Sequence, residues 1–249
     1  MKSIDNFVKI DETIDDLQLK GIKVIQKKKS FRFGIDAVLL SNFSKVKNGN
    51  KVIDLCTGTG IIPFIIAGKT KAEYIKGIEI QEDMVEMANR TVSYNELQER
   101  VEFINKDLKD IKFIKSLDKV DVVTVNPPYK VSGTGIINKN DKNTIARHEI
   151  CCNLDNVMEA SKILLKDKGK FFMVHRPERI ADIMCSMRKF KIEPKLIKMV
   201  YPSYNKKPTM VLIEGQKNAG KFLKWDKPLY VYDENNQYTR EVKDIYGIE

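Results

Sequence analysis

Strand-like and helix-like segments alternate along this chain from residue 51 onward, and this alternation limits its possible folds more than any other feature. Short apolar runs typical of buried strands are separated by segments with apolar residues at helical spacing. The runs are residues 51–55, 74–80, 101–105, 120–125, 170–175, 195–200 and 209–214. Strands that alternate with helices form a parallel sheet covered on both faces. We therefore expect an α/β fold with a Rossmann-like, doubly wound sheet of seven strands.

The last two of these strands are joined differently from the others. Only the turn-rich residues 201–208 separate them, which is too short for a helical crossover between parallel strands. We expect them to pair antiparallel at one side of the sheet. The sheet should thus be mostly parallel, with an antiparallel edge strand.

The length of 249 residues allows one main α/β domain with extensions at both ends. Residues 17–26 have the pattern of a short hairpin, and residues 35–43 that of a helix, so we expect an N-terminal extension over 1–45. The main domain should span 46–217. Residues 218–249 should form a C-terminal tail that packs on it.

The fourth strand runs directly into Asn126-Pro127-Pro128-Tyr129. A proline cannot donate a ladder hydrogen bond and has a fixed φ, and the residue before a proline is held in extended geometry. Asn126 is therefore presented by a backbone with little freedom. Such stiffness is useful in a binding or catalytic site.

The ends of the first three strands also carry candidate site residues. The first strand leads into Asp54 and a turn in which Gly58 and Gly60 allow close approach of a ligand. Glu79 closes the second strand, nineteen residues after Gly60, where doubly wound sheets place an acid that accepts ribose hydroxyls. Asp107 follows the third strand. Because the carboxyl ends of parallel strands meet at one edge, these residues predict a shared ligand site with Asn126.

The glycine turn does not match the dinucleotide-binding fingerprint. That fingerprint requires a third glycine three residues after Gly60, and Pro63 stands there. A cradle for a pyrophosphate is therefore not favoured.

Taken together, these segments resemble the class I methyltransferases that use S-adenosylmethionine, in the branch with an (Asn/Asp/Ser)-Pro-Pro-(Tyr/Phe) motif that methylates planar amino groups. The resemblance covers residues 24–215 and implies that S-adenosylmethionine is the cofactor. The resemblance implies that Asp54, Gly58 and Gly60 bind the methionine part of the cofactor and that Glu79 binds its ribose. It also implies that Ile80 packs on the face of the adenine ring and that Asp107 and Leu108 contact its edge. Asn126 is implied as a further cofactor contact.

The chemistry of such a reaction explains the Asn-Pro-Pro-Tyr motif. An exocyclic nitrogen of adenine is a poor nucleophile, because its lone pair is delocalised into the ring. The two N–H groups of this nitrogen can donate hydrogen bonds to the Asn126 side-chain oxygen and to the carbonyl of Pro127 or Pro128. The Tyr129 ring can stack on the base. The methyl donor carries a sulfonium, which leaves as a neutral thioether, so positioning rather than a strong base provides most of the acceleration.

Several other segments are similar to bacterial methyltransferases that modify the adenine 3′ of the anticodon of a valine tRNA. These segments are residues 26–43, Arg147-His148-Glu149, 175–179, 207–215 and 238–242. The similarity implies transfer of a methyl group to N6 of that adenine in tRNA.

Alternative methyl acceptors are a protein glutamine amide or a base in rRNA or DNA. A glutamine methyltransferase of the release-factor type would need a helical substrate-recognition domain, and too few residues precede Val52 for one. A non-enzymatic alternative is a nucleic-acid-binding protein that kept the fold and lost catalysis.

The distribution of charge supports a polyanionic partner. The chain has a net charge of +10, and residues 185–225 contain ten basic and two acidic residues, a net charge of +8. A lysine-rich solvated surface is the alternative interpretation. The candidate nucleic-acid-binding residues are Arg147, His148, Lys195, Lys206 and Lys207.

The remaining expectations concern metals, disulfides and location. The four cysteines form no Cys-x-x-Cys pair, and neither histidine has a second ligand at metal-binding spacing, so we expect no metal and no disulfide. His175 ends an apolar strand, which favours a structural role. No apolar run reaches the ~18 residues of a membrane span. We expect a cytoplasmic protein that is a monomer.

Overall fold

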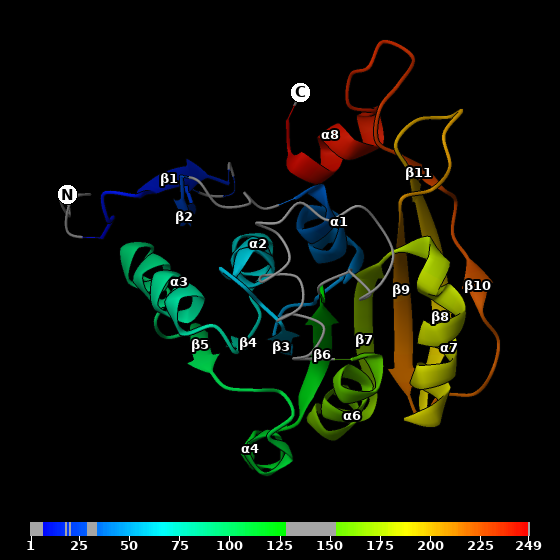
Figure 1. Cartoon of the computed structure of the whole chain (residues 1–249), viewed down its shortest axis with the longest axis horizontal. Coiled ribbons are helices and arrows are strands. Elements are labelled where there is room, and N and C mark those ends of the chain that lie inside the picture. The colour runs from blue at the N-terminus through cyan, green and yellow to red at the C-terminus, as the bar shows by residue number, and fades with distance from the viewer. Residues whose placement is uncertain (1–6, 18, 20, 29–33, 128–152, 249) are drawn as a thin grey trace, which may run out of the picture.

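The computed structural model describes residues 7–17, 19, 21–28, 34–127 and 153–248, and Figure 1 shows its arrangement. Its centre is a nine-stranded sheet in the order β10-β8-β9-β7-β6-β3-β4-β5, with β11 also paired to β8. The strands are β3 (Lys51–Leu55), β4 (Tyr74–Glu79), β5 (Val101–Asn105), β6 (Val120–Val125), β7 (Leu165–His175), β8 (Ile192–Tyr201), β9 (Met210–Lys217), β10 (Lys224–Trp225) and β11 (Leu229–Tyr230). The mostly parallel α/β sheet expected from the sequence is confirmed.

The antiparallel pair is present, but the antiparallel strand does not lie at the edge. β9 pairs antiparallel with both β7 and β8 and is inserted between them, so β8 points the same way as β3 to β7. Burial explains the order. Val211, Leu212 and Ile213 of β9 are all buried, as in a strand covered on both faces, whereas β8 has a mixed burial pattern. The sheet has nine strands rather than the seven expected, because the short strands β10 and β11 pair with β8. Each has two residues, which are too few to give a periodic signal.

Helices cover both faces of the sheet (Figure 1). α1 (Ile35–Phe43), α2 (Ile61–Lys69) and α3 (Glu82–Tyr94) contribute to one hydrophobic cluster, and α4 (Ile111–Ser116), α6 (Leu154–Leu164) and α7 (Ile180–Lys189) contribute to the other. The short 3-10 helix η2 (Pro177–Arg179) precedes α7. Neighbouring strand residues alternate between the clusters, since Val52 lies in the first and Ile53 in the second.

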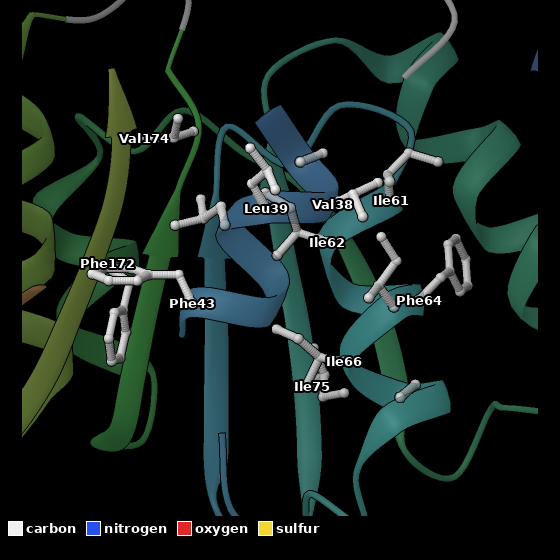
Figure 2. Packing of buried hydrophobic residues seen from close by; sticks show 14 of the residues in the cluster. Val38, Leu39, Phe43, Ile61, Ile62, Phe64, Ile66, Ile75, Phe172 and Val174 are labelled. Carbon is white, nitrogen blue, oxygen red and sulfur yellow. The ribbon is translucent and has the colours of Figure 1, made fainter. Parts of the chain in front are cut away.

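α1 is firmly packed in the first cluster. Figure 2 shows Val38 and Leu39 of α1 near Ile62 of α2, with the Phe43 ring beside Phe172 of β7. The two rings meet edge to face, with centroids 5.8 Å apart and an interplanar angle of 89°. The body and the C-terminal end of α1 are thus fixed relative to the sheet.

The N-terminal hairpin lies against α3. It is formed by β1 (Glu12–Asp16) and β2 (Lys23–Lys27), so its first strand begins before the 17–26 segment that the sequence indicated. The polar β1 has no apolar pattern to reveal it. Its Glu12 is nevertheless buried, because Arg90 of α3 donates to both of its carboxylate oxygens at 2.7 Å. Lys27 pairs with Asp83 at 2.6 Å.

The C-terminal tail crosses from β8 to α1 and α2. Thr239 caps α8 (Arg240–Tyr246), and Val242 and Ile245 join the hydrophobic cluster that contains α1. Lys69 of α2 donates to the Ile245 carbonyl at 2.7 Å. Tyr238 stacks between Tyr232 and Tyr246, with ring centroids 5.4 and 5.5 Å apart. The tail is therefore part of the packed core on this face.

Candidate active site

Four neighbouring strands end at the same edge of the sheet. The parallel register pairs Leu55 of β3 with Ile78 of β4 and with Val125 of β6, while Glu79 of β4 pairs with Asn105 of β5. The segments that follow these strands therefore lie next to one another, as the sequence predicted. The last residues of these strands and the segments that follow them contain every cofactor-binding residue expected from the sequence.

Asp54 is fully buried at the end of β3. Its register partner on β6 is Thr124, whose hydroxyl donates to Asp54 Oδ1 at 2.6 Å. The other carboxylate oxygen, Oδ2, and the Thr57 hydroxyl oxygen are buried without a hydrogen bond in the described structure. Burial raises the pKa of Asp54 to about 7, and the hydrogen bond from the Thr124 hydroxyl opposes this rise. An orphaned, buried carboxylate oxygen of this kind suits a cationic ligand group.

The glycine turn after β3 has three residues in left-handed backbone geometry, Cys56, Gly58 and Gly60, with φ of 55°, 56° and 83°. A Cβ on Gly58 would meet no atom within 4 Å, whereas a Cβ on Gly60 would lie 2.3 Å from Phe103 Cζ. Gly60 is therefore needed for internal packing. Gly58 borders open space, as expected of a turn that receives a ligand.

Glu79 ties the glycine turn to the start of α3. Its Oε2 accepts from the Gly58 amide at 2.9 Å, and its Oε1 accepts from the amides of Ile80 and Gln81 at 3.0 and 3.1 Å. Oε2 has one protein donor in the described structure, so it has capacity for a ligand hydroxyl. The expected role of Glu79 in holding a ribose stays a prediction, and these contacts give it a second, structural role.

The residues expected around an adenine differ in exposure. The Ile80 side chain is 43% exposed beside Glu79, which is unusual for an isoleucine and suits packing on a flat apolar ligand. Asp107 is half-buried, and its Oδ1 accepts from the Lys109 amide at 2.9 Å. Leu108 is buried in the core, so only its backbone is available to a ligand. Asn105, which the sequence did not single out, donates to the Ile80 carbonyl at 3.0 Å and so fixes this loop.

Asn126 and Pro127 follow β6 at the same edge. Asn126 is half-buried, and its side-chain nitrogen Nδ2 donates to Asp36 Oδ2 at 3.0 Å. Asp36 lies in the first turn of α1 and is not among the site residues predicted from the sequence. The expected contributions of Pro128 and Tyr129, and those of Arg147 and His148, fall outside the described residues.

His175 ends β7 next to this edge. It is 3% exposed, and its Nδ1 accepts from the Arg176 amide at 2.8 Å. Burial lowers the pKa of His175 to about 4, so the imidazole is neutral near pH 7. These features suit the structural role that the sequence favoured.

The basic residues of the 185–225 stretch do not form one surface. Lys206 and Lys207 are exposed in the loop between β8 and β9, and this loop lies at the Asn126 edge because β8 runs parallel to β6. Lys191 and Lys221 lie at the opposite end of the sheet, where they line an open pocket. Lys195 is near the start of β8, and its Nζ donates to the Gly220 and Lys221 carbonyls at 3.0 Å. Strand direction thus divides the basic 185–225 stretch between the two ends of the sheet, so the whole stretch is not one surface beside the active edge.

The site has the features that a nucleoside-containing cation requires. Asp54 provides a buried acceptor, Gly58 borders open space, and Ile80 exposes an apolar surface beside Glu79. These residues fit S-adenosylmethionine, which has an ammonium group, a ribose and an adenine. Among the described residues, no cluster of three or more His, Cys, Asp or Glu side chains could hold a metal, and no helix is suited to span a membrane.

Comparisons with known proteins agree with this geometry. The family model described as "Methyltransferase domain" matches residues 46–236. A Bacteroides thetaiotaomicron protein named tRNA1(Val) (adenine(37)-N6)-methyltransferase is 29% identical over 166 residues, covering 66% of this chain and 68% of its own. A Phocaeicola vulgatus protein of the same name is 25% identical over 231 residues, covering 91% and 95% of the two chains.

Solved structures share the fold. The crystal structure of a predicted O-methyltransferase from Agrobacterium tumefaciens superposes with a TM-score of 0.69 at 18% identity, covering 85% of this chain and 95% of that one. TrmN from Thermus thermophilus superposes with a TM-score of 0.54 at 14% identity, covering 73% and 48%. The family model matches most of the chain, including all four strand ends of the site, and the chain therefore belongs to the methyltransferase-domain family.

Proposed function

We propose that this protein transfers a methyl group from S-adenosylmethionine to N6 of an adenine in tRNA, namely the adenine 3′ of the anticodon of a valine tRNA. The observation that carries this proposal is the position of Asn126 and Pro127 at the end of β6, beside the β3 end with Asp54 and the glycine turn. A planar amino group held by Asn126 would lie next to the cofactor. The names of the Bacteroides and Phocaeicola relatives support the choice of substrate.

The residues of the chain act mainly by positioning. When bound, S-adenosylmethionine supplies an electrophilic methyl group on a sulfonium. The side-chain oxygen of Asn126 accepts a hydrogen bond from one N–H group of the adenine amino group, and a carbonyl of Pro127 or Pro128 accepts one from the other N–H group. These acceptors localise the nitrogen lone pair toward the methyl group. Tyr129 would stack on the adenine and hold its amino group toward the methyl group.

The recognition of RNA requires a base that can leave its stack. A base in an anticodon loop meets this condition more easily than a paired base. At the active edge, Lys206 and Lys207 provide positive charge, and the neighbouring Tyr204 ring is 77% exposed, with its centroid 5.7 Å from that of Tyr230. Lysines next to exposed aromatic rings favour a nucleic-acid partner over a neutral one.

Other expectations remain predictions. Arg147 and His148 are expected to contact the RNA, and Tyr129 to stack on the target base. The protein is expected to act as a monomer in the cytoplasm, where tRNA is found.

The first experiment is methyl transfer from labelled S-adenosylmethionine to bulk tRNA that lacks its own modifications, followed by mass analysis of the nucleosides. We expect label in N6-methyladenosine. Asn126→Ala should bind the cofactor normally and lose most turnover, about 100-fold, because it removes an acceptor used in the transition state. Cofactor binding with no label in RNA would contradict the tRNA assignment and indicate another acceptor, such as a protein amide.

A further inference from the structure

The contact between Asp36 and Asn126 joins two segments that are far apart in the sequence. Asn126 Nδ2 donates to Asp36 Oδ2 at 3.0 Å, across 90 residues of chain. Asp36 lies in the first turn of α1, and the buried residues of α1 pack against α2 and β7 (Figure 2). The carboxylate is therefore held on a rigid support rather than on a loose loop.

The chemistry of this pair determines the orientation of the Asn126 amide. The two ends of an asparagine side chain have the same shape but opposite hydrogen-bonding character, with an acceptor oxygen and a donor nitrogen. An ionised carboxylate only accepts hydrogen bonds, so it attracts the nitrogen end and repels the oxygen end. Since the amide is planar, the side-chain oxygen then points away from Asp36.

We infer that Asp36 is a positioning residue of the methyl transfer: it holds Nδ2 of Asn126 so that the side-chain oxygen is presented to the amino group of the substrate. This inference rests on the proposed function. Without Asp36, the amide would also populate the flipped orientation, which directs N–H groups at the substrate amino group. The flipped amide cannot accept a hydrogen bond from the substrate amino group, so it does not support methyl transfer.

The inference is tested with Asp36→Leu, which removes the acceptor at similar size, and Asp36→Asn, whose side-chain oxygen can still accept from Asn126. We expect Asp36→Leu to lower kcat about 10- to 100-fold, the range for loss of a hydrogen bond to a charged group, with KM changed less than about 3-fold. Asp36→Asn should retain kcat within about 5-fold of the wild type. In an Asn126→Ala background, Asp36→Leu should cause no further loss of kcat, because Asp36 is inferred to act on the reaction through Asn126.

Asp83→Leu is the matched control for helix stability. Asp83 is also an acid in the first turn of a helix, α3, and it pairs with Lys27 rather than with a site residue. The Asp83→Leu variant should keep kcat within about 2-fold of the wild type, since the substitution removes a helix-dipole interaction and a surface ion pair and no contact with a site residue. Equal losses of kcat in the two leucine variants would overturn the inference, as would full kcat in Asp36→Leu.

A readout that does not require turnover separates this inference from the proposed function. The side-chain amide signals of Asn126 in a ¹H–¹⁵N spectrum, assigned by their loss in Asn126→Ala, should shift in Asp36→Leu and remain in place in Asp83→Leu. If wild-type protein failed to methylate tRNA while these signals still shifted, the proposed function would be wrong and the contact would stand. Unchanged signals in a folded Asp36→Leu protein would refute the positioning role.

Discussion

Asp54 combines complete burial with a carboxylate oxygen that has no hydrogen bond in the described structure. Desolvation raises its pKa to about 7, so in the cofactor-free protein the carboxyl is about half protonated near neutral pH. A protonated carboxyl does not attract an ammonium group. The charge state of Asp54 should therefore control affinity for the methionine part of S-adenosylmethionine.

We expect the affinity for S-adenosylmethionine to rise about 8-fold between pH 6 and pH 7.5, as the ionised fraction of a group with a pKa of about 7 grows from roughly a tenth to three quarters. Calorimetric titration measures this, and proton release on binding should accompany it. Asp54→Asn should bind more weakly and lose the pH dependence. A wild-type affinity that is constant over this range would contradict the role of Asp54.

Binding is a better measurement here than folding stability. Because the folded-state pKa of Asp54 is raised, its contribution makes the protein less stable as pH rises from about 4 to 7. The folded-state pKa of His175 is lowered from 6.5 to about 4, so its contribution makes the protein less stable as pH falls through that range. The two effects have opposite signs in the same window and would partly cancel in an unfolding curve.

The sequence indicated some of these residues and missed others for a physical reason. Asp54, Glu79 and Asn126 each follow a strand, and the ends of parallel strands meet at one edge, so local pattern was enough to group them. The partner of Asn126 was not predictable in this way, because Asp36 reaches it only through the packing of α1 on the sheet.

At the level of elements, the C-terminal helix α8 is bound to the domain by few but well-buried residues. Val242 is 0% exposed and Ile245 is 8% exposed, and both belong to the cluster that includes α1. Because α1 carries Asp36, the packing of α8 bears indirectly on the active site. The C-terminal tail, which was expected to pack on the domain, thus packs against the helix that carries Asp36.

We expect Ile245→Ala to lower the free energy of unfolding by about 2 to 4 kcal/mol, since it removes buried methyl groups and leaves a cavity. The Tm should fall by about 5 to 10 °C for a chain of this size. Phe222→Ala is the control in the same tail, because its side chain is 85% exposed and its loss should change the Tm by less than about 2 °C. Thermal unfolding that showed equal effects would mean that α8 is not anchored by Ile245.

Element prediction succeeded where the apolar pattern was complete and failed where neighbours decided the result. Strands β3, β5 and β6 and helix α1 have the bounds read from the sequence. The position of β9 between β7 and β8 depends on whether β8 or β9 is more fully buried by the rest of the protein. The local sequence pattern of either strand does not show this. The strand β1 was missed because Arg90, a distant residue, neutralises its Glu12.

For the whole molecule, the direction of β8 separates the basic residues into two groups. Lys206 and Lys207 lie at the active edge, and Lys191 and Lys221 lie at the other end of β8 and β9. Ten residues of strand at about 3.3 Å each place the groups about 30 Å apart. A tRNA with its anticodon loop at Asn126 would approach the first group, and the second group would be a solvated surface.

This division gives two charge-reversed variants of equal net charge, Lys206→Glu/Lys207→Glu and Lys191→Glu/Lys221→Glu. We expect the first to weaken tRNA binding about 10-fold or more at 0.1 M salt and to reduce the slope of log Kd against log salt by about 1 to 2, because up to two phosphate contacts are lost. The second should change Kd less than about 3-fold, through net charge alone. Affinity for S-adenosylmethionine should be normal in both variants, which checks folding. If the second pair weakened tRNA binding as much as the first, the RNA would not be recognised at the active edge, and strand direction would give no guide to the docking surface.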